Sequence, residues 1–176
     1  MQTLAVVLAA VVAATWYLTW TAARLDRLHA RIEGARAALD AQLLRRASVA
    51  QELAISALLD PATSVLLAAA AHEARACGEE DREVAESDLT KALRAAFDDP
   101  EAVAAVSADP YGGELLAELG AAARRVQLAR RFHNDAVRAA RAVRRQRVVR
   151  YLRLAGRAPL PDSFEIEDSP PAFVGH

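Results

Sequence analysis

The sequence predicts an all-α fold: an N-terminal transmembrane helix that continues into an elongated antiparallel bundle of about four helices. Most apolar residues are Ala, Leu or Val, and aromatic residues make up only 5% of the chain, a mixture that favours helices over strands. Apolar residues recur at helical spacing, and no stretch alternates in the manner of a strand. The length of 176 residues suits one domain plus an anchor.

Residues 1–23 are expected to be a membrane anchor. No charged side chain occurs in TLAVVLAAVVAATWYLTWTAA, residues 3–23, which as a helix would span roughly 30 Å, the thickness of the hydrocarbon core of a bilayer. Trp16, Tyr17 and Trp20 lie near its end, where amphipathic rings prefer the headgroup zone. A cleavable signal peptide is the alternative, but it would need a basic segment before the apolar run.

The charges on either side of this segment predict its orientation. The α-amino group is the only positive charge before it, whereas four arginines follow it: Arg24, Arg27, Arg31 and Arg36. The positive-inside rule therefore places the short N-terminus outside the cell membrane and the body in the cytoplasm.

Residues 24–154 are expected to form the helical bundle, and its first helix should continue from the anchor to about Leu59, where the Asp-Pro pair at 60–61 stops it. One face of this helix follows strict 3-4 heptad spacing, with polar residues at two seam positions. The seam consists of Leu25, Leu28, Ile32, Ala35, Leu39, Gln42, Arg46, Val49 and Leu53.

Two shorter helices are expected next. One covers about residues 62–76 and ends before Gly78, since glycine accepts the positive φ of a helix C-terminus. The other covers about residues 79–97 and has acidic residues in its first turns, where the helix dipole favours them. Residues 98–113 contain two prolines and a glycine pair, which predict a loop with a short helical turn.

The last helix is expected to run from about Glu114 to about Leu154. Its predicted apolar face consists of Leu115, Leu119, Ala122, Val126, Ala129, Phe132, Ala136, Ala140 and Val143. Residues 155–176 contain several prolines and show no periodicity, so they are expected to be an extended or disordered tail.

Two motifs resemble those of the LemA family. They are AALDAQLLRRASVAQELA, residues 37–54, and VQLARRFHNDAV, residues 126–137, which lie between an N-terminal apolar segment and an aromatic-acidic-proline tail, SFEIEDSPPAF. The resemblance covers nearly the whole chain and implies a single-pass bacterial membrane protein with a long-helix bundle and an extracellular N-terminus. It implies no biochemical activity, because the molecular role of that family is unsettled. The chain departs from the family at SVAQELA, where relatives often have DLIPNLV, and at His133, where Tyr is common.

Charge is distributed unevenly along the chain. Residues 73–118 contain thirteen acidic and four basic residues, and residues 124–157 contain twelve arginines and a single aspartate, so we expect the two segments to pair within the molecule. An antiparallel last helix would return its far end to the membrane, where anionic lipid headgroups would be the partner of Arg144, Arg145, Arg147, Arg150 and Arg153. Nucleic acid is less favoured, since the anchor holds the body at a membrane.

No motif indicates catalysis, a cofactor or a metal ion. The four histidines form no i, i+4 pair, and the segment with His72, Glu73 and Cys77 lacks the second histidine of a zincin helix. No Ser, Cys or Lys lies in a recognisable nucleophile motif, and no Gly-rich phosphate loop occurs. Cys77 is the only cysteine, so it cannot form an intramolecular disulfide.

Polar residues interrupt the apolar faces of the first and last helices. Gln42 and Arg46 lie in the seam of the first helix, and Asn134 and Asp135 lie in the middle of the last. We expect Arg46 to donate to Asp135, with the amides of Gln42 and Asn134 completing a polar layer that fixes the register of the two helices. A recognition groove lined by the same four residues is the alternative interpretation.

These observations favour a membrane-anchored helical scaffold without catalytic activity, whose body offers a surface to protein partners. The alternative is a membrane-proximal anion binder that holds lipid headgroups or nucleic acid through the arginine-rich last helix. An enzyme has the least support.

Overall fold

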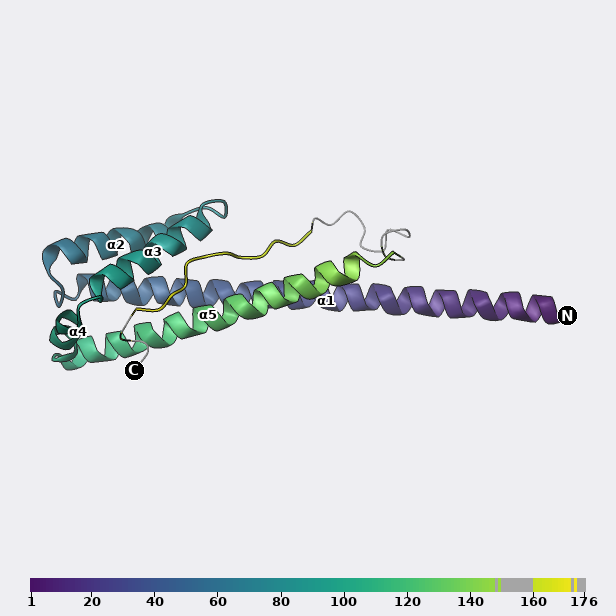
Figure 1. The fold of residues 1–176 in the computed structure, drawn as a ribbon, viewed down its shortest axis with the longest axis horizontal. Helices are drawn as coiled ribbons and strands as arrows, with labels where there is room; N and C mark the ends of the chain where they lie inside the picture. Colours follow the sequence, from purple (N-terminus) through teal and green to yellow (C-terminus); the bar gives the residue numbers. More distant parts are fainter. Residues whose placement is uncertain (148, 150–159, 172, 174–176) are drawn as a thin grey trace. The chain divides into compact units, whose positions relative to one another are not determined.

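The computed structural model describes residues 1–147, 149, 160–171 and 173. Its regular structure is helical, and no strand occurs among these residues, so the predicted all-α class is confirmed. Five helices are described (Figure 1): α1 (Gln2–Ile55), α2 (Pro61–Ala76), α3 (Arg82–Ala96), α4 (Pro100–Ser107) and α5 (Pro110–Arg144). The last helix is shorter than the predicted span to Leu154, because α5 ends at Arg144 and residues 145 and 146 form a turn and a bend. Residue 154 itself lies outside the described residues.

α1 is a single continuous helix, as the sequence predicts, but it ends at Ile55 and not near Leu59. The chain turns immediately after it, because Ala57 adopts a left-handed backbone conformation with φ of 61°. The Ser56 hydroxyl donates to the Leu53 carbonyl oxygen at 2.8 Å and so satisfies one of the last carbonyls of the helix.

Aspartate-proline pairs begin three of the five helices. The Asp60 carboxylate accepts hydrogen bonds from the backbone N–H groups of Ala62 and Thr63 at 3.0 and 3.1 Å, and Asp99 and Asp109 bind the first turns of α4 and α5 in the same way. Hydrogen bonds from Thr63 also hold the pKa of the Asp60 carboxyl below its usual value. The predicted loop at residues 98–113 is therefore mostly helical, and α5 begins four residues earlier than Glu114.

The chain divides into two compact units, each of which includes part of α1 and part of α5. We call residues 1–36 with 133–163 the anchor unit, and residues 37–132 with 164–176 the bundle unit. In the anchor unit, Ile32 packs against Ala136, and Leu25 packs against Val143 and Val149. The earlier residue of α1, Leu25, packs against the later residue of α5, Val143, so the two helices are antiparallel within this unit.

The bundle unit shows the same antiparallel pairing and contains the main core. Leu43 of α1 packs against Val126 of α5, and the Tyr111 hydroxyl donates to Glu52 Oε1 at 2.7 Å. The core includes side chains from all five helices, among them Leu53, Leu67, Leu89, Val106 and Leu119. The side chains at every predicted seam position of α1 are buried or half-buried, which confirms the seam as the inward face.

The inward face of α5 differs from the prediction at one position. The sequence predicts an inward Phe132, but its side chain is 54% exposed, whereas His133 is only 2% exposed. The alternating spacing of three and four residues that fits Val126, Ala129 and Ala136 requires position 133 and not 132. The helical period therefore decides which side chain is buried, even though the buried one is the more polar of the two.

Residues 164–171 of the tail follow an extended path between α3 and α5 in the bundle unit (Figure 1). Phe164 and Ile166 pack against the cluster formed by Leu39, Leu43 and Val126. The Phe173 ring meets the Phe97 ring edge to face, with the centroids 5.3 Å apart. The described part of the tail is thus a packed element of this unit without regular secondary structure.

We predict that alanine is destabilising at the first of the two neighbouring glycines at the start of α5 and tolerated at the second. A Cβ at Gly112 would lie 2.2 Å from the Val106 carbonyl oxygen, whereas a Cβ at Gly113 would have nothing closer than the Ser107 carbonyl oxygen at 3.7 Å. Gly112→Ala should lower the free energy of unfolding by about 2 kcal/mol or more. Gly113→Ala should leave it unchanged or raise it by up to about 1 kcal/mol.

Urea unfolding of the full chain in detergent, followed by circular dichroism, measures both changes. Equal effects of the two substitutions would contradict the close approach of α4 to α5 at Gly112.

Candidate functional site

The most deeply buried charges of the bundle unit form a pair between α1 and α3. Arg46 Nη2 lies 2.7 Å from Glu86 Oε2 and also donates to the Glu86 carbonyl oxygen at 3.1 Å, while Arg46 Nη1 donates to Thr90 Oγ1 at 3.0 Å. The side chains of Arg46 and Glu86 are 3% and 1% exposed. Since removing two charges from water is expensive, the pair holds only because each charge finds its partner inside.

The predicted pair between Arg46 and Asp135 is wrong. Arg46 pairs with Glu86, and Asp135 is exposed and forms an ion pair with Arg138, one turn along the same helix. Of the other two residues of the expected polar layer, Gln42 is half-buried and Asn134 is 6% exposed. Adjacent residues of a helix point about 100° apart, so Asn134 and Asp135 cannot both face inward.

Sequence reasoning missed Glu86, although a signal for it exists in α3. Glu86 and Thr90 lie at helical spacing with Leu89 and Leu93, and all four side chains are buried. A carboxylate on an inward face needs a basic partner, and the arginine in the seam of α1 is one. A buried arginine in the seam of α1 therefore predicts a buried carboxylate on a neighbouring helix. The spacing alone does not say which helix carries that carboxylate.

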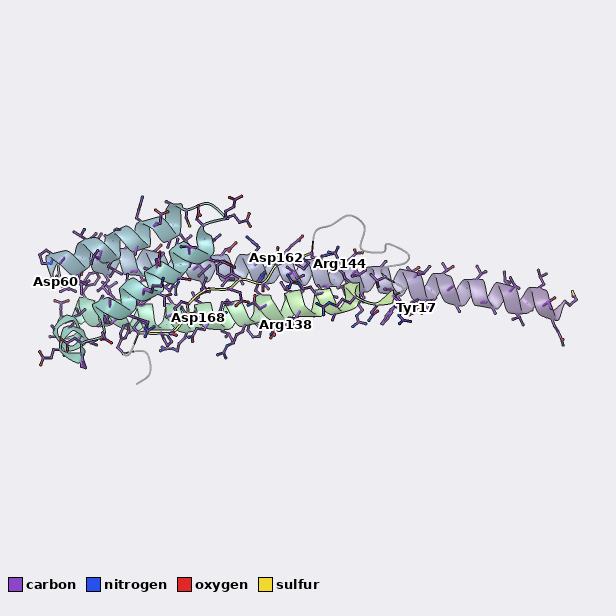
Figure 2. All side chains as sticks on the ribbon, turned by 45° about the horizontal axis from the view of Figure 1, so that its top comes forward. Tyr17, Asp60, Arg138, Arg144, Asp162 and Asp168 are labelled. Atoms are coloured by element: carbon purple, nitrogen blue, oxygen red, sulfur yellow. The ribbon has the colours of Figure 1, made fainter. Side chains whose placement is uncertain are left out.

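The basic end of α5 surrounds a cavity in the anchor unit. The cavity has a volume of about 580 Å³ and is lined by Arg141, Arg144, Arg145, Leu160 and Asp162. Arg141 Nε donates to the Pro161 carbonyl oxygen and Arg141 Nη2 to Asp162 Oδ1, both at 2.8 Å. Figure 2 shows Asp162 beside Arg144. The cavity therefore presents three guanidinium groups, and that of Arg141 holds the Asp162 carboxylate.

The predicted anion-facing arginines have different positions in the structure. Arg144 is half-buried, and Arg145 and Arg147 are exposed. Arg150 and Arg153 lie outside the described residues. Within the anchor unit, Val143 and Val149 pack against Leu25, which follows the apolar segment by two residues, so the arginines beside Val143 lie close to the end of that segment.

His133 is buried next to the start of the tail in the anchor unit. Its Nε2 lies 3.3 Å from the Asp162 carbonyl oxygen, and its Nδ1 has no hydrogen-bond partner among the described residues. The side chain fills the seam position of α5 that the helical spacing assigns to it. We assign it a packing role, because the described structure places no further polar side chain on the imidazole.

The acidic partners of α5 differ from those that the sequence suggests. Arg130 pairs with Glu165 and Asp168 of the tail, and Arg141 pairs with Asp162. From the acidic segment 73–118, Glu86 and Glu118 pair with Arg46 and Arg45 of α1. Intramolecular pairing thus occurs, and the α5 arginines Arg130 and Arg141 pair with acidic residues of the tail.

The residues considered for metal binding do not form a site. In the described part of the chain, no three His, Cys, Asp or Glu side chains come close enough together to hold a metal ion. Cys77 is half-buried and not in a disulfide. Its partial burial raises the pKa of the thiol, and the nearby charge of Glu86 adds to this effect, so the thiolate forms less readily than in an exposed cysteine.

Two features of the described residues could therefore bind another molecule: the basic cavity of the anchor unit and the groove that the tail occupies in the bundle unit. The Arg46 and Glu86 pair is enclosed and serves the fold. Comparisons of the chain with protein-family models, curated proteins and solved structures gave no match.

We predict that Arg46 and Glu86 are strongly coupled. Glu86→Leu should lower the free energy of unfolding by about 3 to 5 kcal/mol, because it leaves a buried guanidinium unpaired, and adding Arg46→Met should recover much of that loss. Asp135→Leu is the matched control and should change stability by about 0.5 kcal/mol or less, because its ion pair is exposed. A double-mutant cycle by urea unfolding measures the coupling, and additive effects at positions 46 and 86 would contradict the pair.

Proposed function

We propose that the chain is a single-pass, membrane-anchored helical scaffold of LemA type, whose body lies in the cytoplasm and binds other proteins. The observation that carries the proposal is α1, the one helix among the described residues that is long and apolar enough to cross a membrane. Its first part is exposed and the rest belongs to the helical body without a break. An exposed apolar surface of this length is stable in lipid and not in water.

Three hydroxyl groups in the apolar part of α1 find their hydrogen-bond partners within the helix itself, which supports a bilayer environment. The hydroxyls of Thr15, Thr19 and Thr21 each donate to the backbone carbonyl four residues earlier, at 2.7 to 2.8 Å. Groups satisfied in this way do not need water. Near the end of this part, the Arg24 guanidinium lies 5.7 Å from the centre of the Trp20 ring, a pairing that suits the headgroup zone.

Charge and exposure support the proposed orientation and binding role. Arginines immediately after the apolar part favour a cytoplasmic body. The body exposes apolar side chains that a protein partner could cover, such as Val65 and Leu66 of α2, each 69% exposed. We assign the body no reaction, because the sequence contains no nucleophile motif and no phosphate loop.

A second candidate function is favoured by the cavity of the anchor unit. Its three arginines lie near the end of the apolar part of α1, where phosphate groups of anionic lipids are found. Guanidinium groups bind phosphate oxygens with paired hydrogen bonds. The arginine-rich end of α5 would then hold a lipid headgroup and orient the body at the membrane surface.

We predict that the full chain resists extraction from membranes by alkaline carbonate, and that Cys77 reacts with an impermeant maleimide only after cell lysis. Lysis should be followed by mild denaturation and labelling at slightly alkaline pH, because partial burial raises the pKa of the Cys77 thiol. Release of the chain into the carbonate supernatant would refute the anchor. Labelling in intact cells would place the body outside.

We predict that the chain retains phosphatidylglycerol over phosphatidylcholine when it is extracted from mixed vesicles. Arg144→Gln with Arg145→Gln should weaken this preference by roughly fivefold for each charge removed, at low ionic strength. Arg125→Gln with Arg131→Gln removes the same charge from exposed positions of α5 in the bundle unit and should have little effect. Lipid counts from native mass spectrometry measure both. An equal loss in the two double variants would rule out the cavity as the headgroup site.

A further inference from the structure

The tail crosses the bundle unit as an extended peptide, and its backbone is held by side chains of the helices. The Glu165 N–H donates to Glu83 Oε1 at 2.8 Å and the Glu167 N–H donates to Ser87 Oγ at 3.1 Å, both on α3. From α5, Gln127 Nε2 donates to the Asp168 carbonyl oxygen at 2.7 Å. Backbone contacts of this kind fix the path of a peptide and do not depend on its side chains.

Charge fixes the register of the tail. Arg130 Nε lies 2.8 Å from Asp168 Oδ2, and Arg130 Nη1 lies 3.4 Å from Glu165 Oε2. The Arg130 and Asp168 side chains are only 20% and 18% exposed, so this pair is partly shielded from water. With the Gln127 contact to the same residue, Asp168 is bound through both its backbone and its side chain.

Apolar contacts alternate with these polar ones. Phe164 and Ile166, two residues apart, both face the helices, as expected for an extended chain whose successive side chains point in opposite directions. They cover Leu39, Leu43 and Val126, which are at most 1% exposed. The residues between and after them, Glu165 and Glu167, are exposed.

We propose that this groove, between α3 and α5 and floored by α1, is a recognition site for an extended acidic segment of a partner protein, and that the chain's own tail is its resident ligand. The segment would have an aromatic residue at its first position, an aliphatic residue at its third and aspartate at its fifth, as Phe164, Ile166 and Asp168 are arranged here. The inference rests on the proposed scaffold function and names the surface and the chemistry of the partner.

Three properties support a displaceable ligand. The contacts described above use helix side chains, so their loss leaves the backbone hydrogen bonds of α3 and α5 in place. The groove offers a positive group, Arg130, to an acidic peptide, and this complementarity selects against neutral or basic segments. A partner segment with the same pattern would make the same contacts as the tail does.

The test uses the full chain in detergent and a fluorescent peptide of residues 160–173, LPDSFEIEDSPPAF, as the probe. The resident tail competes at an effective concentration in the millimolar range, so the wild-type chain should bind the peptide weakly. Phe164→Ala with Ile166→Ala in the chain weakens the resident tail, and the peptide should then bind at least tenfold more tightly by fluorescence anisotropy. A peptide with Asp168→Asn should lose most of this affinity, because its charge-assisted contact with Arg130 is lost.

Neighbouring arginines of α5 provide a matched control on the groove. Added to the weakened-tail chain, Arg130→Gln should reduce peptide affinity by roughly tenfold or more, because a charge-assisted contact is lost. Arg131→Gln removes the same charge from an exposed position and should have little effect. Equal effects of the two substitutions would mean attraction by net charge alone and would overturn the proposal.

Hydrogen exchange of the wild-type chain keeps the proposal falsifiable if the weakened-tail variant does not fold. The amides of Glu165 and Glu167 should exchange through local opening, much faster than the amide of Leu89 in the core of α3. Exchange at the same rate would make the tail an inseparable part of the core and would overturn the proposal.

The oligomeric state of the chain is a separate check. A dimer that disappears when residues 160–176 are deleted would assign the groove to a second copy's tail and would also overturn the proposal. Carbonate extraction tests the membrane anchor independently of all these outcomes. The proposed anchor can therefore be correct even if the proposed groove is wrong.

Discussion

The buried ion pair between Arg46 and Glu86 is the constraint on which the arrangement of the bundle unit depends. Arg46 lies in the heptad seam of α1, where an apolar residue is expected, and it can be buried only if a carboxylate is present at the same depth. α3 supplies that carboxylate with Thr90 beside it, on the same face as Leu89 and Leu93. A shift of one residue would rotate α3 by about 100° and leave a buried charge unpaired. The pair therefore selects one register from several that apolar packing alone would accept.

The groove for the tail follows from the same register. With Glu86 directed to α1, Glu83 and Ser87 lie where their side chains accept the backbone N–H groups of the tail. The opposite wall presents Arg130 of α5, which binds Asp168. The acidic residues of the tail thus offset part of the positive charge of α5, while Phe164 and Ile166 complete the apolar core. Interior charge selects the register, and that register creates a surface site for an acidic extended chain.

The sequence predicts those features that a single periodic pattern determines. The all-α class and the inward face of α1 could be derived because heptad spacing and helix geometry are local properties. The partner of Arg46 could not be derived, because its identity depends on which helix packs against the seam of α1. Hydrophobicity favours Phe132 for the inward position, but the helical spacing gives that position to His133. The path of the tail could not be derived either, since an extended segment without periodicity is ordered by the surface it contacts, and its composition alone is typical of disorder.

The most direct test of the central claim is nitrogen-15 NMR of the arginine side chains in the full chain in detergent micelles. If Arg46 is enclosed with Glu86 and Thr90, its Nη protons should give separate, slowly exchanging signals at neutral pH. Arg45, next in sequence and 53% exposed, provides the internal reference and should show averaged, fast-exchanging protons. Nη protons of Arg46 that exchange as fast as those of Arg45 would contradict the buried pair, and with it the register that we derive from it.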